Sequence, residues 1–249
     1  MLPIKNLKIR IALMSALLVL TACGGPEVAS GIYDPFETAN RRTHEVNRTL
    51  DRVLLRPSSG AYGKILPEPV RNGVGNFSSN LSMPSMVLND LLQFKLGDAI
   101  HNTARFVVNT TLGVGGVFDV ATKGGIASRD SDFGETLHVW GFKEGAFVEL
   151  PILGPSTTRD TIGGIANFLL DPIGQIVAPK NRVAVTAVSA ASSLGDRYRF
   201  TDTIDSILYE SADSYAQARL FYLENRRFQL GIDAGEDDGL YDLYDEAYE

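Results

Sequence analysis

The chain has 249 residues, a formal net charge of −7, 44% hydrophobic residues and a single cysteine, Cys23. One cysteine excludes a disulfide within the chain and a cysteine-based metal cluster. Residues 1–22 hold three cations and no anion, whereas residues 233–249 hold eight acidic residues and no Lys or Arg. The stretch between them is almost neutral, at −2, and therefore lacks the charge excess that nucleic-acid binding requires.

Residues 1–22 are predicted to be a lipoprotein signal peptide. A basic start precedes an apolar run from Ile11 to Leu20, about half the roughly twenty residues needed to span a bilayer. The letters LTAC end this run, and small residues directly before a cysteine are typical of a bacterial acylation site. We expect Cys23 to be the acylated first residue of the mature chain, the alternative being a plain secretory signal. Without an aspartate after Cys23, an outer-membrane location is expected.

Residues 34–112 are predicted to be almost entirely helical, because apolar residues recur at spacings of three, four and seven. The expected boundaries are an N-cap and first-turn proline at Asp34-Pro35, a stop at Pro57, new starts near Pro67 and at Pro84, and an N-cap at Asp98. In the first helix, a face of mixed charge is expected to meet solvent and an apolar face to pack inward. That apolar face consists of Phe36, Ala39, Val46, Leu50 and Val53.

The rest of the body is predicted to be helical around a glycine-rich middle. Residues 113–160 hold many glycines and short β-like pieces such as 147–153. Further helices are expected from an N-cap at Ser156 to Leu170, over 181–197, and from Ala212 to Leu230. Residues 23–232 are thus predicted to form one domain, followed by an acidic, Tyr-rich tail (233–249) whose charge predicts disorder.

Two segments, Phe106–Ala121 and Thr161–Pro179, combine very low charge with several glycines. Neither can span a bilayer, and irregular backbone at membrane depth is tolerated only where protein or water satisfies its polar groups. They are expected either to lie in one leaflet and shape a passage or to be ordinary core helices with glycine turns. Asp119, the one charged residue of the first segment, is expected to need a donor or water.

The sequence shows no catalytic, cofactor or metal motif. Its histidines, His44, His101 and His138, are far apart and outside any metal-ligand spacing. No G-x-S-x-G sequence is present, so a lipase with a nucleophile elbow has no support. A dispersed triad of a serine with His138 and Asp132 stays open as an alternative.

Several ordered motifs show that the chain resembles the MlaA (VacJ) family of outer-membrane phospholipid-transport lipoproteins. The motifs are YDPFETANR, PEPVRNGVGNFSSNL, RFVVNTTLGVGGVFDVA, DFGETLHVWG, and ELPILGPSTTRD leading to LDPIG. The resemblance extends from about Tyr33 to Leu230 and leaves out the acidic tail.

This resemblance implies a mainly α, single ring-like helical domain with glycine-rich loops and only short β pieces. The ring would lie in the inner leaflet of the outer membrane, anchored on its periplasmic face. Phospholipid from the outer leaflet would pass through an amphipathic channel to a soluble periplasmic carrier, MlaC. The resemblance also implies association with trimeric porins and no covalent chemistry.

The family motifs point to three groups of site residues besides the acylation site, Cys23. Packing of the first helix against the ring is expected from Asp34, Pro35, Asn40 and Arg41. The channel-region candidates are Gly113, Gly115, Gly116, Phe118 and Asp119. A later motif supplies Gly154, Arg159 and Asp160, the last two expected to be a fold-fixing ion pair more than a headgroup ligand. The main alternative function is a structural or virulence-associated surface lipoprotein that binds partners without moving lipid.

Overall fold

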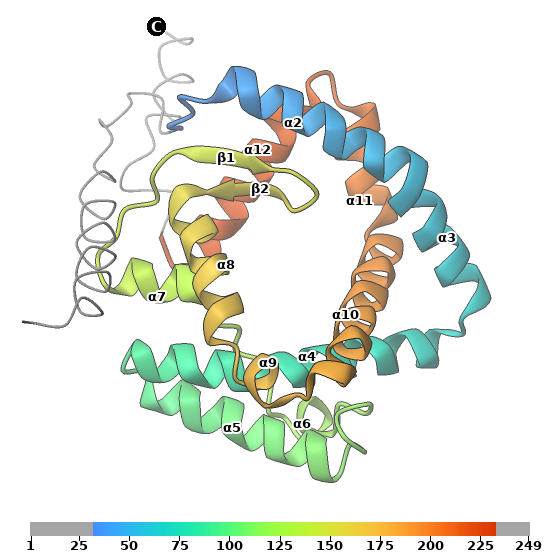
Figure 1. Cartoon of the computed structure of the whole chain (residues 1–249), viewed down its shortest axis with the longest axis vertical. Helices are drawn as coiled ribbons and strands as arrows, with labels where there is room; N and C mark the ends of the chain where they lie inside the picture. Colours follow the sequence, from blue (N-terminus) through green and yellow to red (C-terminus); the bar gives the residue numbers. More distant parts are fainter. Residues whose placement is uncertain (1–31, 233–249) are drawn as a thin grey trace, which may run out of the picture.

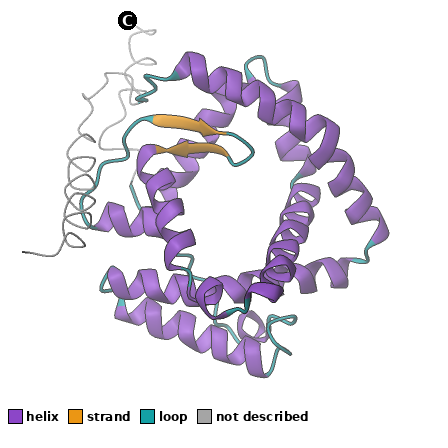
Figure 2. Ribbon diagram, viewed as in Figure 1, coloured by secondary structure: helices purple, strands orange, loops and turns teal. Residues whose placement is uncertain are grey.

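The computed structural model describes residues 32–232, whose helices follow one another around a ring that a β-hairpin completes (Figure 1). The first half consists of α2 (Glu37–Leu50), the π-helical segment η2 (Asp51–Leu55), α3 (Arg56–Ile65), α4 (Glu68–Leu92), α5 (Leu96–Thr111), α6 (Val120–Lys123) and α7 (Phe133–Val139). The second half consists of β1 (Phe147–Leu150), β2 (Gly154–Thr157), α8 (Thr158–Leu170), α9 (Pro172–Ile176), α10 (Pro179–Arg199), α11 (Thr201–Asp205), the π-helical segment η3 (Ser206–Glu210) and α12 (Ser214–Gln229). The predicted mainly α fold with only short β pieces is confirmed (Figure 2).

Contacts between elements far apart in the chain close the ring. α10 packs against both α3 and α4, and α12 packs against η3 and β2. β1 pairs antiparallel with β2, from Phe147 opposite Thr157 to Leu150 opposite Gly154, and β1 also packs against α2. The first and last described helices are therefore joined through the hairpin.

The wall of the ring has a polar interior and an apolar exterior. Among residues 32–232, 18 buried residues are polar or charged and 9 are hydrophobic, whereas 30 large hydrophobic residues are exposed. A water-soluble domain shows the opposite preference, because burial of apolar side chains is its main stabilising contribution. The one cluster of buried apolar residues in this part of the chain, Phe147, Tyr215 and Leu223, joins β1 to α12. Apolar surface on this scale marks contact with a membrane or another protein.

Helix α2 shows this inversion directly. Its buried residues are Asn40 and His44, and Asp51 follows on the same face in η2. Val46 and Val53, on the face expected to pack inward, are 56% and 63% exposed. That expectation is wrong because the inner face is held by hydrogen bonds and ion pairs, which leaves the apolar stripe facing outward.

Two prolines do not interrupt the helices as predicted. Pro57 lies in the first turn of α3, which follows η2 directly, so the helical path continues past it. The wider π-helical turn before it accommodates a residue that lacks an N–H group. Pro84 lies inside α4 instead of opening a new helix. Packing of α4 along α5 offsets the roughly 3 kcal/mol that an interior proline costs.

The predicted N-caps are displaced by a few residues. α2 begins after Phe36, and Asp34 binds other elements instead of capping it. Asp98 lies in the first turn of α5. Ser156 belongs to β2, and the cap of α8 is Thr157, whose hydroxyl oxygen accepts from the backbone N–H of Asp160. The predicted end of α8 at Leu170 is confirmed.

Between residues 32 and 232, no helix combines the length and apolar character needed to cross a bilayer. The same residues contain no group of His, Cys, Asp or Glu arranged to hold a metal ion. The predicted signal peptide with Cys23 and the acidic tail (233–249) lie outside the described residues.

Candidate functional site

The centre of the ring is bordered by α8 and α10 (Figures 1 and 2). Residues 181–184 of α10 are all exposed, and so are residues 168–170 at the end of α8. Successive residues of an α-helix are about 100° apart, so four in a row cover most of the circumference. The side of α10 that faces the centre is therefore uncovered in this part of the helix, and packed side chains do not fill the ring there.

The exposed surface of α10 is amphipathic and made of small residues. The exposed side chains of this helix include the apolar Val183, Ala184 and Ala187 and the polar Arg182 and Thr186. Such a border offers both apolar contact and hydrogen-bonding groups to a molecule beside it. The ring centre therefore suits an amphiphile better than a purely polar or purely apolar ligand.

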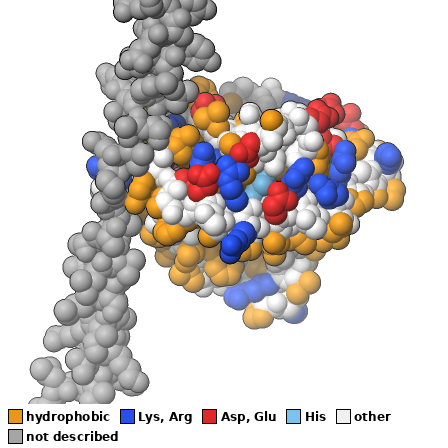
Figure 3. Space-filling view, turned by 90° about the horizontal axis from the view of Figure 1, so that it is seen from above, with side chains coloured by type: hydrophobic (Ala, Val, Ile, Leu, Met, Phe, Trp, Pro, Cys, Tyr) orange, Lys and Arg blue, Asp and Glu red, His pale blue; other side chains and the backbone are white. Residues whose placement is uncertain are grey.

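The outer apolar residues lie on several elements of the ring. Phe94, in the turn between α4 and α5, is 87% exposed, and Ile100, near the start of α5, is 71% exposed. Phe168 of α8 is 82% exposed. Figure 3 shows hydrophobic side chains gathered along one edge of the molecule, with charged side chains on the face beside it. This separation of apolar and charged surface is what a protein needs when it sits at the boundary between lipid and water.

The glycine-rich turn after α5 depends on left-handed backbone. Val114, Gly115 and Gly116 have φ values of 53°, 73° and 96°. A Cβ at Gly116 would overlap the side chain of Asn80, and a Cβ at Gly113 would overlap backbone oxygens. The turn leaves Phe118 56% exposed at its end. These residues therefore shape a sharp turn against α4 in which Gly113 and Gly116 are buried and Phe118 is exposed.

Asp119 ties this turn to α5 and α6. Its carboxylate accepts from the backbone N–H of Thr122 at 3.0 Å, from the Nδ2 of Asn109 at 3.1 Å and from the guanidinium of Arg105 at 3.2 and 3.3 Å. Burial alone would raise the pKa of Asp119, but hydrogen bonds from Thr122, Asn109 and Arg105 outweigh it and lower the pKa to about 2. The one charge in the segment thus has its donors, as the sequence required.

The N-terminal motif connects α2 to the hairpin and to α12. Asn40 donates to the carbonyl of Phe147 at 3.1 Å and accepts from the N–H of Glu149 at 3.0 Å, so it pairs with the edge of β1. Asp34 accepts from Asn40 at 2.9 Å and from Arg219 of α12 at 2.6 Å. These contacts hold the start of the described chain against the last helix.

Arg41 makes the same connection at the surface. Its guanidinium donates two hydrogen bonds to Asp213, at 3.0 and 2.9 Å, just before α12. The hydrogen bonds from Arg41 lower the pKa of Asp213 to about 2. Pro35 occupies the turn that precedes α2.

The later motif ties α8 to α12, because the main partner of Asp160 differs from the expected one. Asp160 lies 3.0 Å from the guanidinium of Arg226 and accepts from the hydroxyl of Tyr222 at 2.7 Å, both on α12. Arg159 is buried and lies 3.5 Å from Asp160, and its Nε and Nη2 have no hydrogen-bond partner among the described residues. Gly154 opens β2 with φ 83°.

A polar cluster around the buried Asp51, Arg197 and Asp205, missed by sequence reasoning, joins the two π-helical segments. Arg197 of α10 donates to both carboxylate oxygens of Asp51 in η2, at 2.8 and 2.9 Å, and to Asp205 of α11 at 2.6 Å. Arg56 donates to Asp205 at 2.6 Å, and the hydroxyl of Tyr209 in η3 donates to Asp51 at 2.7 Å. We call these five residues the polar joint. No local signal could have identified it, because Asp51 and Arg197 are 146 residues apart.

Comparison with known proteins agrees with this geometry. Residues 32–229 match the family model of the MlaA lipoprotein. The chain belongs to the MlaA lipoprotein family. It is 32% identical to the intermembrane phospholipid transport system lipoprotein MlaA of Escherichia coli K12 over 222 residues, which are 88% of this chain and 86% of that protein. An uncharacterized protein of Rickettsia bellii is 35% identical over 189 residues, 76% of this chain and 73% of that one.

A solved structure shares the MlaA ring. It comes from work described as "Structural basis for maintenance of bacterial outer membrane lipid asymmetry" and matches with a TM-score of 0.68 at 31% identity. The match covers 79% of this chain and 98% of that chain. The expected resemblance and the ring-like helical fold of this MlaA family member are therefore confirmed.

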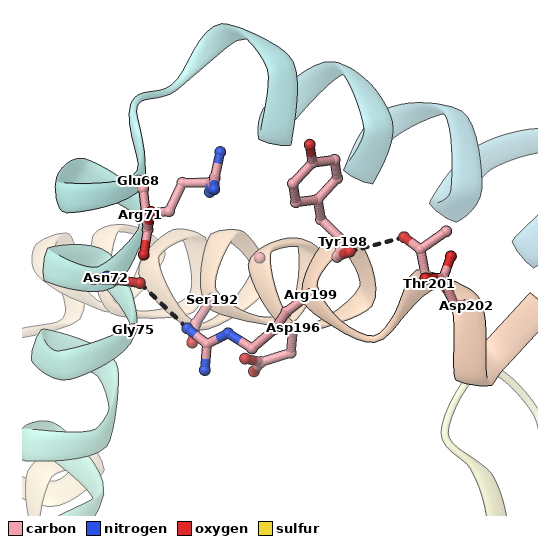
Figure 4. Close-up of a pocket in the computed structure, with 11 residues that line it drawn as sticks. Glu68, Arg71, Asn72, Gly75, Ser192, Asp196, Tyr198, Arg199, Thr201 and Asp202 are labelled. Carbon is pink, nitrogen blue, oxygen red and sulfur yellow. Dashed lines mark hydrogen bonds between the residues drawn. The ribbon is translucent and has the colours of Figure 1, made fainter.

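A pocket of about 460 Å³ lies where α4 meets α10 and α11 in this MlaA ring (Figure 4). Its charged lining residues are Glu68, Arg71, Asp196, Arg199 and Asp202. The other lining residues are Asn72, Gly75, Ser192, Gly195, Tyr198 and Thr201. None of these positions was singled out from the sequence as a site. They come from the start of α4 and from the α10–α11 junction, which are about 120 residues apart in the chain.

Proposed function

We propose that this protein is an outer-membrane lipoprotein whose ring forms a passage for phospholipid. The passage removes phospholipid that has strayed into the outer leaflet and so maintains the lipid asymmetry of the membrane. The observation that carries the proposal is the inverted distribution of residues, with an apolar exterior around a polar, open ring. In a member of the MlaA family, this distribution fits a body that sits in lipid and passes an amphiphile.

The proposed depth of insertion is one leaflet. In this position the exposed apolar side chains would contact the acyl chains of that leaflet. Polar backbone in the glycine-rich turn is then acceptable, because the protein itself satisfies it. The Nδ2 groups of Asn76 and Asn80 on α4 donate to the carbonyls of Val117 and Gly115, and the N–H of Gly115 donates to the carbonyl of Thr110. The acyl groups expected on Cys23 would hold the ring at the periplasmic face of the outer membrane.

The proposed partners follow from the same position. A passage that ends at the periplasm must deliver an insoluble lipid to a soluble carrier, and MlaC is the carrier that the family resemblance implies. A ring in one leaflet also needs a neighbour that spans the membrane, and we propose a trimeric porin. Support for both is the resemblance together with an apolar exterior large enough for protein as well as lipid contact.

We propose further that the protein acts without covalent chemistry. In the candidate triad, Asp132 is occupied, because its carboxylate oxygens lie 2.8 Å from the guanidinium nitrogens of Arg226 and one of them caps α7. Within the described residues, no serine or carboxylate hydrogen-bonds the ring of His138. Release of fatty acid from phospholipid by the purified protein would contradict this part of the proposal.

The test of the passage is crosslinking from α10 in living cells. A photoreactive amino acid is placed at Asn181, Arg182, Val183 and Ala184 in turn, because four successive exposed positions sample all faces of the helix. Phospholipid adducts are expected at the positions facing the ring centre, and an exposed position on the charged face of α2, Arg42, serves as control. Protein adducts alone at every position on α10 would favour the alternative, a partner-binding surface lipoprotein.

Gene deletion provides the second test. Loss of the protein should raise outer-leaflet phospholipid and detergent sensitivity, and a plasmid copy should reverse both. An unchanged outer leaflet, in a parent strain that expresses the protein, would overturn the proposed function.

A further inference from the structure

The pocket at the junction of α4, α10 and α11 contains unpaired charges of both signs. The side-chain carboxylates of Glu68, Asp196 and Asp202 make no hydrogen bond or ion pair with any described residue. Arg199 donates one long hydrogen bond, at 3.3 Å, to the side-chain oxygen of Asn72. Its remaining N–H groups are therefore available to a ligand.

The second arginine of the pocket is already committed to the fold. Arg71 donates to the backbone carbonyls of Gly63 and Leu66, and its guanidinium lies over the ring of Tyr198 at 4.9 Å. Figure 4 shows its side chain directed from α4 toward Tyr198, whereas Arg199 is directed toward Asn72. The pocket thus presents one available cation and three available anions.

One available cation beside three available anions favours a zwitterionic ligand. The carboxylates are not grouped closely enough to hold a metal ion, and a ligand with cationic groups alone would leave Arg199 without a counter-charge. A guanidinium matches two oxygens of a phosphate, and carboxylates match an ammonium group. The net negative charge of the three carboxylates and two arginines disfavours a headgroup that is anionic overall.

The size of the pocket suits the headgroup of a lipid. The volume of about 460 Å³ falls within the range of pockets that hold small molecules. A pocket of this size with charged groups of both signs fits a phospholipid headgroup.

We propose that this pocket binds the headgroup of a zwitterionic phospholipid with a primary ammonium group. The phosphate lies against Arg199 and Asn72, and the ammonium group lies toward Asp196, Asp202 and Glu68. The inference rests on the proposed function for the source of the ligand, the membrane, and adds a headgroup preference at a second place on the ring. The pocket would hold such a lipid at the edge of the ring.

The experiment measures adducts and bound lipid in the full chain in mild detergent. A photoreactive amino acid at Ser192 reports on the pocket, and one at Val183 reports on the ring centre. Each is exposed to equal amounts of phosphoethanolamine and phosphoglycerol lipids with identical acyl chains. The expected result is a preference of at least threefold for phosphoethanolamine adducts at Ser192. Equal labelling by the two lipids there would overturn the proposal.

Substitutions test the two halves of the headgroup separately. Arg199→Gln should lower the Ser192 adduct several-fold and leave the Val183 adduct unchanged, and Arg199→Lys should restore part of it. Asp196→Asn combined with Asp202→Asn should remove the preference between the two lipids. Arg42→Gln and Glu224→Gln, at exposed positions outside the pocket, are the matched controls.

The two proposals fail in different ways. In one outcome, lipid adducts form at Val183, and Arg199→Gln does not change the adduct at Ser192. This would overturn the headgroup pocket and keep the passage. Adducts at Ser192 that respond to Arg199→Gln, with none along α10 near the ring centre, would keep the pocket and overturn the passage.

Discussion

The substitution Asp51→Asn tests whether the polar joint holds the ring closed. Asp51 is 5% exposed and accepts two hydrogen bonds from Arg197 and one from Tyr209. The amide keeps one acceptor and turns the other into a donor that faces donors. Removing one partner of a buried ion pair costs about 3–5 kcal/mol. Because Asp205 still lies 2.6 Å from Arg197, we expect the lower figure of about 2–3 kcal/mol.

The joint should also make stability depend on pH in a defined direction. Burial alone would raise the pKa of Asp51, but hydrogen bonds from Arg197 and Tyr209 outweigh it and hold the pKa below its usual value. A lowered pKa means that the folded state binds this proton less readily than the unfolded chain. The stabilisation is therefore complete above the unfolded pKa of about 4 and is lost as the pH falls through the folded pKa. The difference between wild type and Asp51→Asn should shrink in the same window.

The assay is thermal unfolding in mild detergent, followed by circular dichroism at pH 7 and at a series of lower pH values. For a domain of this size, about 2–3 kcal/mol corresponds to a midpoint lowered by about 5–10 °C. The matched control is Asp202→Asn on α11, an exposed carboxylate without a partner among the described residues, which should change the midpoint little. Equal midpoints for wild type and Asp51→Asn at pH 7 would refute the view that the joint supports the ring.

Three further predictions concern the turn, its carboxylate and the apolar surface. Gly116→Ala should destabilise the protein by more than about 2 kcal/mol, because a φ of 96° is strained for alanine and the new Cβ would meet Asn80. Gly115→Ala should cost less, about 1–2 kcal/mol, because Gly115 has a φ of 73° and open space around it. Asp119→Asn should cost about 2 kcal/mol at pH 7 through the weakened contact with Arg105. Since the pKa of Asp119 is lowered to about 2, this difference should fade as the pH drops from about 4 toward 2. Ile100→Asp, at a residue 71% exposed, should leave the thermal midpoint unchanged in detergent and weaken flotation with vesicles.

A specific result would contradict each of these three predictions. Equal midpoints for the two glycine variants would show that contact with Asn80 does not restrict the turn. A constant difference between Asp119→Asn and wild type down to pH 2 would contradict the lowered pKa. Unchanged flotation of Ile100→Asp, beside a control Lys64→Asp on α3, would place the start of α5 outside the lipid.

The local structure of most segments follows from the sequence. The β-like piece at 147–153, the end of α8 at Leu170 and the small-residue helix α10 were all predictable. The left-handed turn at Gly115 and Gly116 was expected from its glycines, and Asp119 was expected to need donors. These features depend on backbone conformation and neighbouring residues, which a single sequence displays directly.

Which face of a helix is buried did not follow from the sequence. Periodicity placed Val46 and Val53 on one face of the first helix, and in water such a face turns inward. In the ring this face is exposed, while Asn40 and His44 are buried. Periodicity reports that two faces differ, and the solvent around the protein decides which one points outward.

The sequence by itself determined the mainly α composition, the glycine turn after α5, the absence of recognisable catalytic motifs and, through its motifs, membership of the MlaA family. Only the tertiary structure decided the polar joint, the partner of Asp160 on α12 and the pocket between α4 and α10. Each of these brings together residues from helices distant in the chain. Their contacts depend on how the ring closes, which no spacing within one segment records.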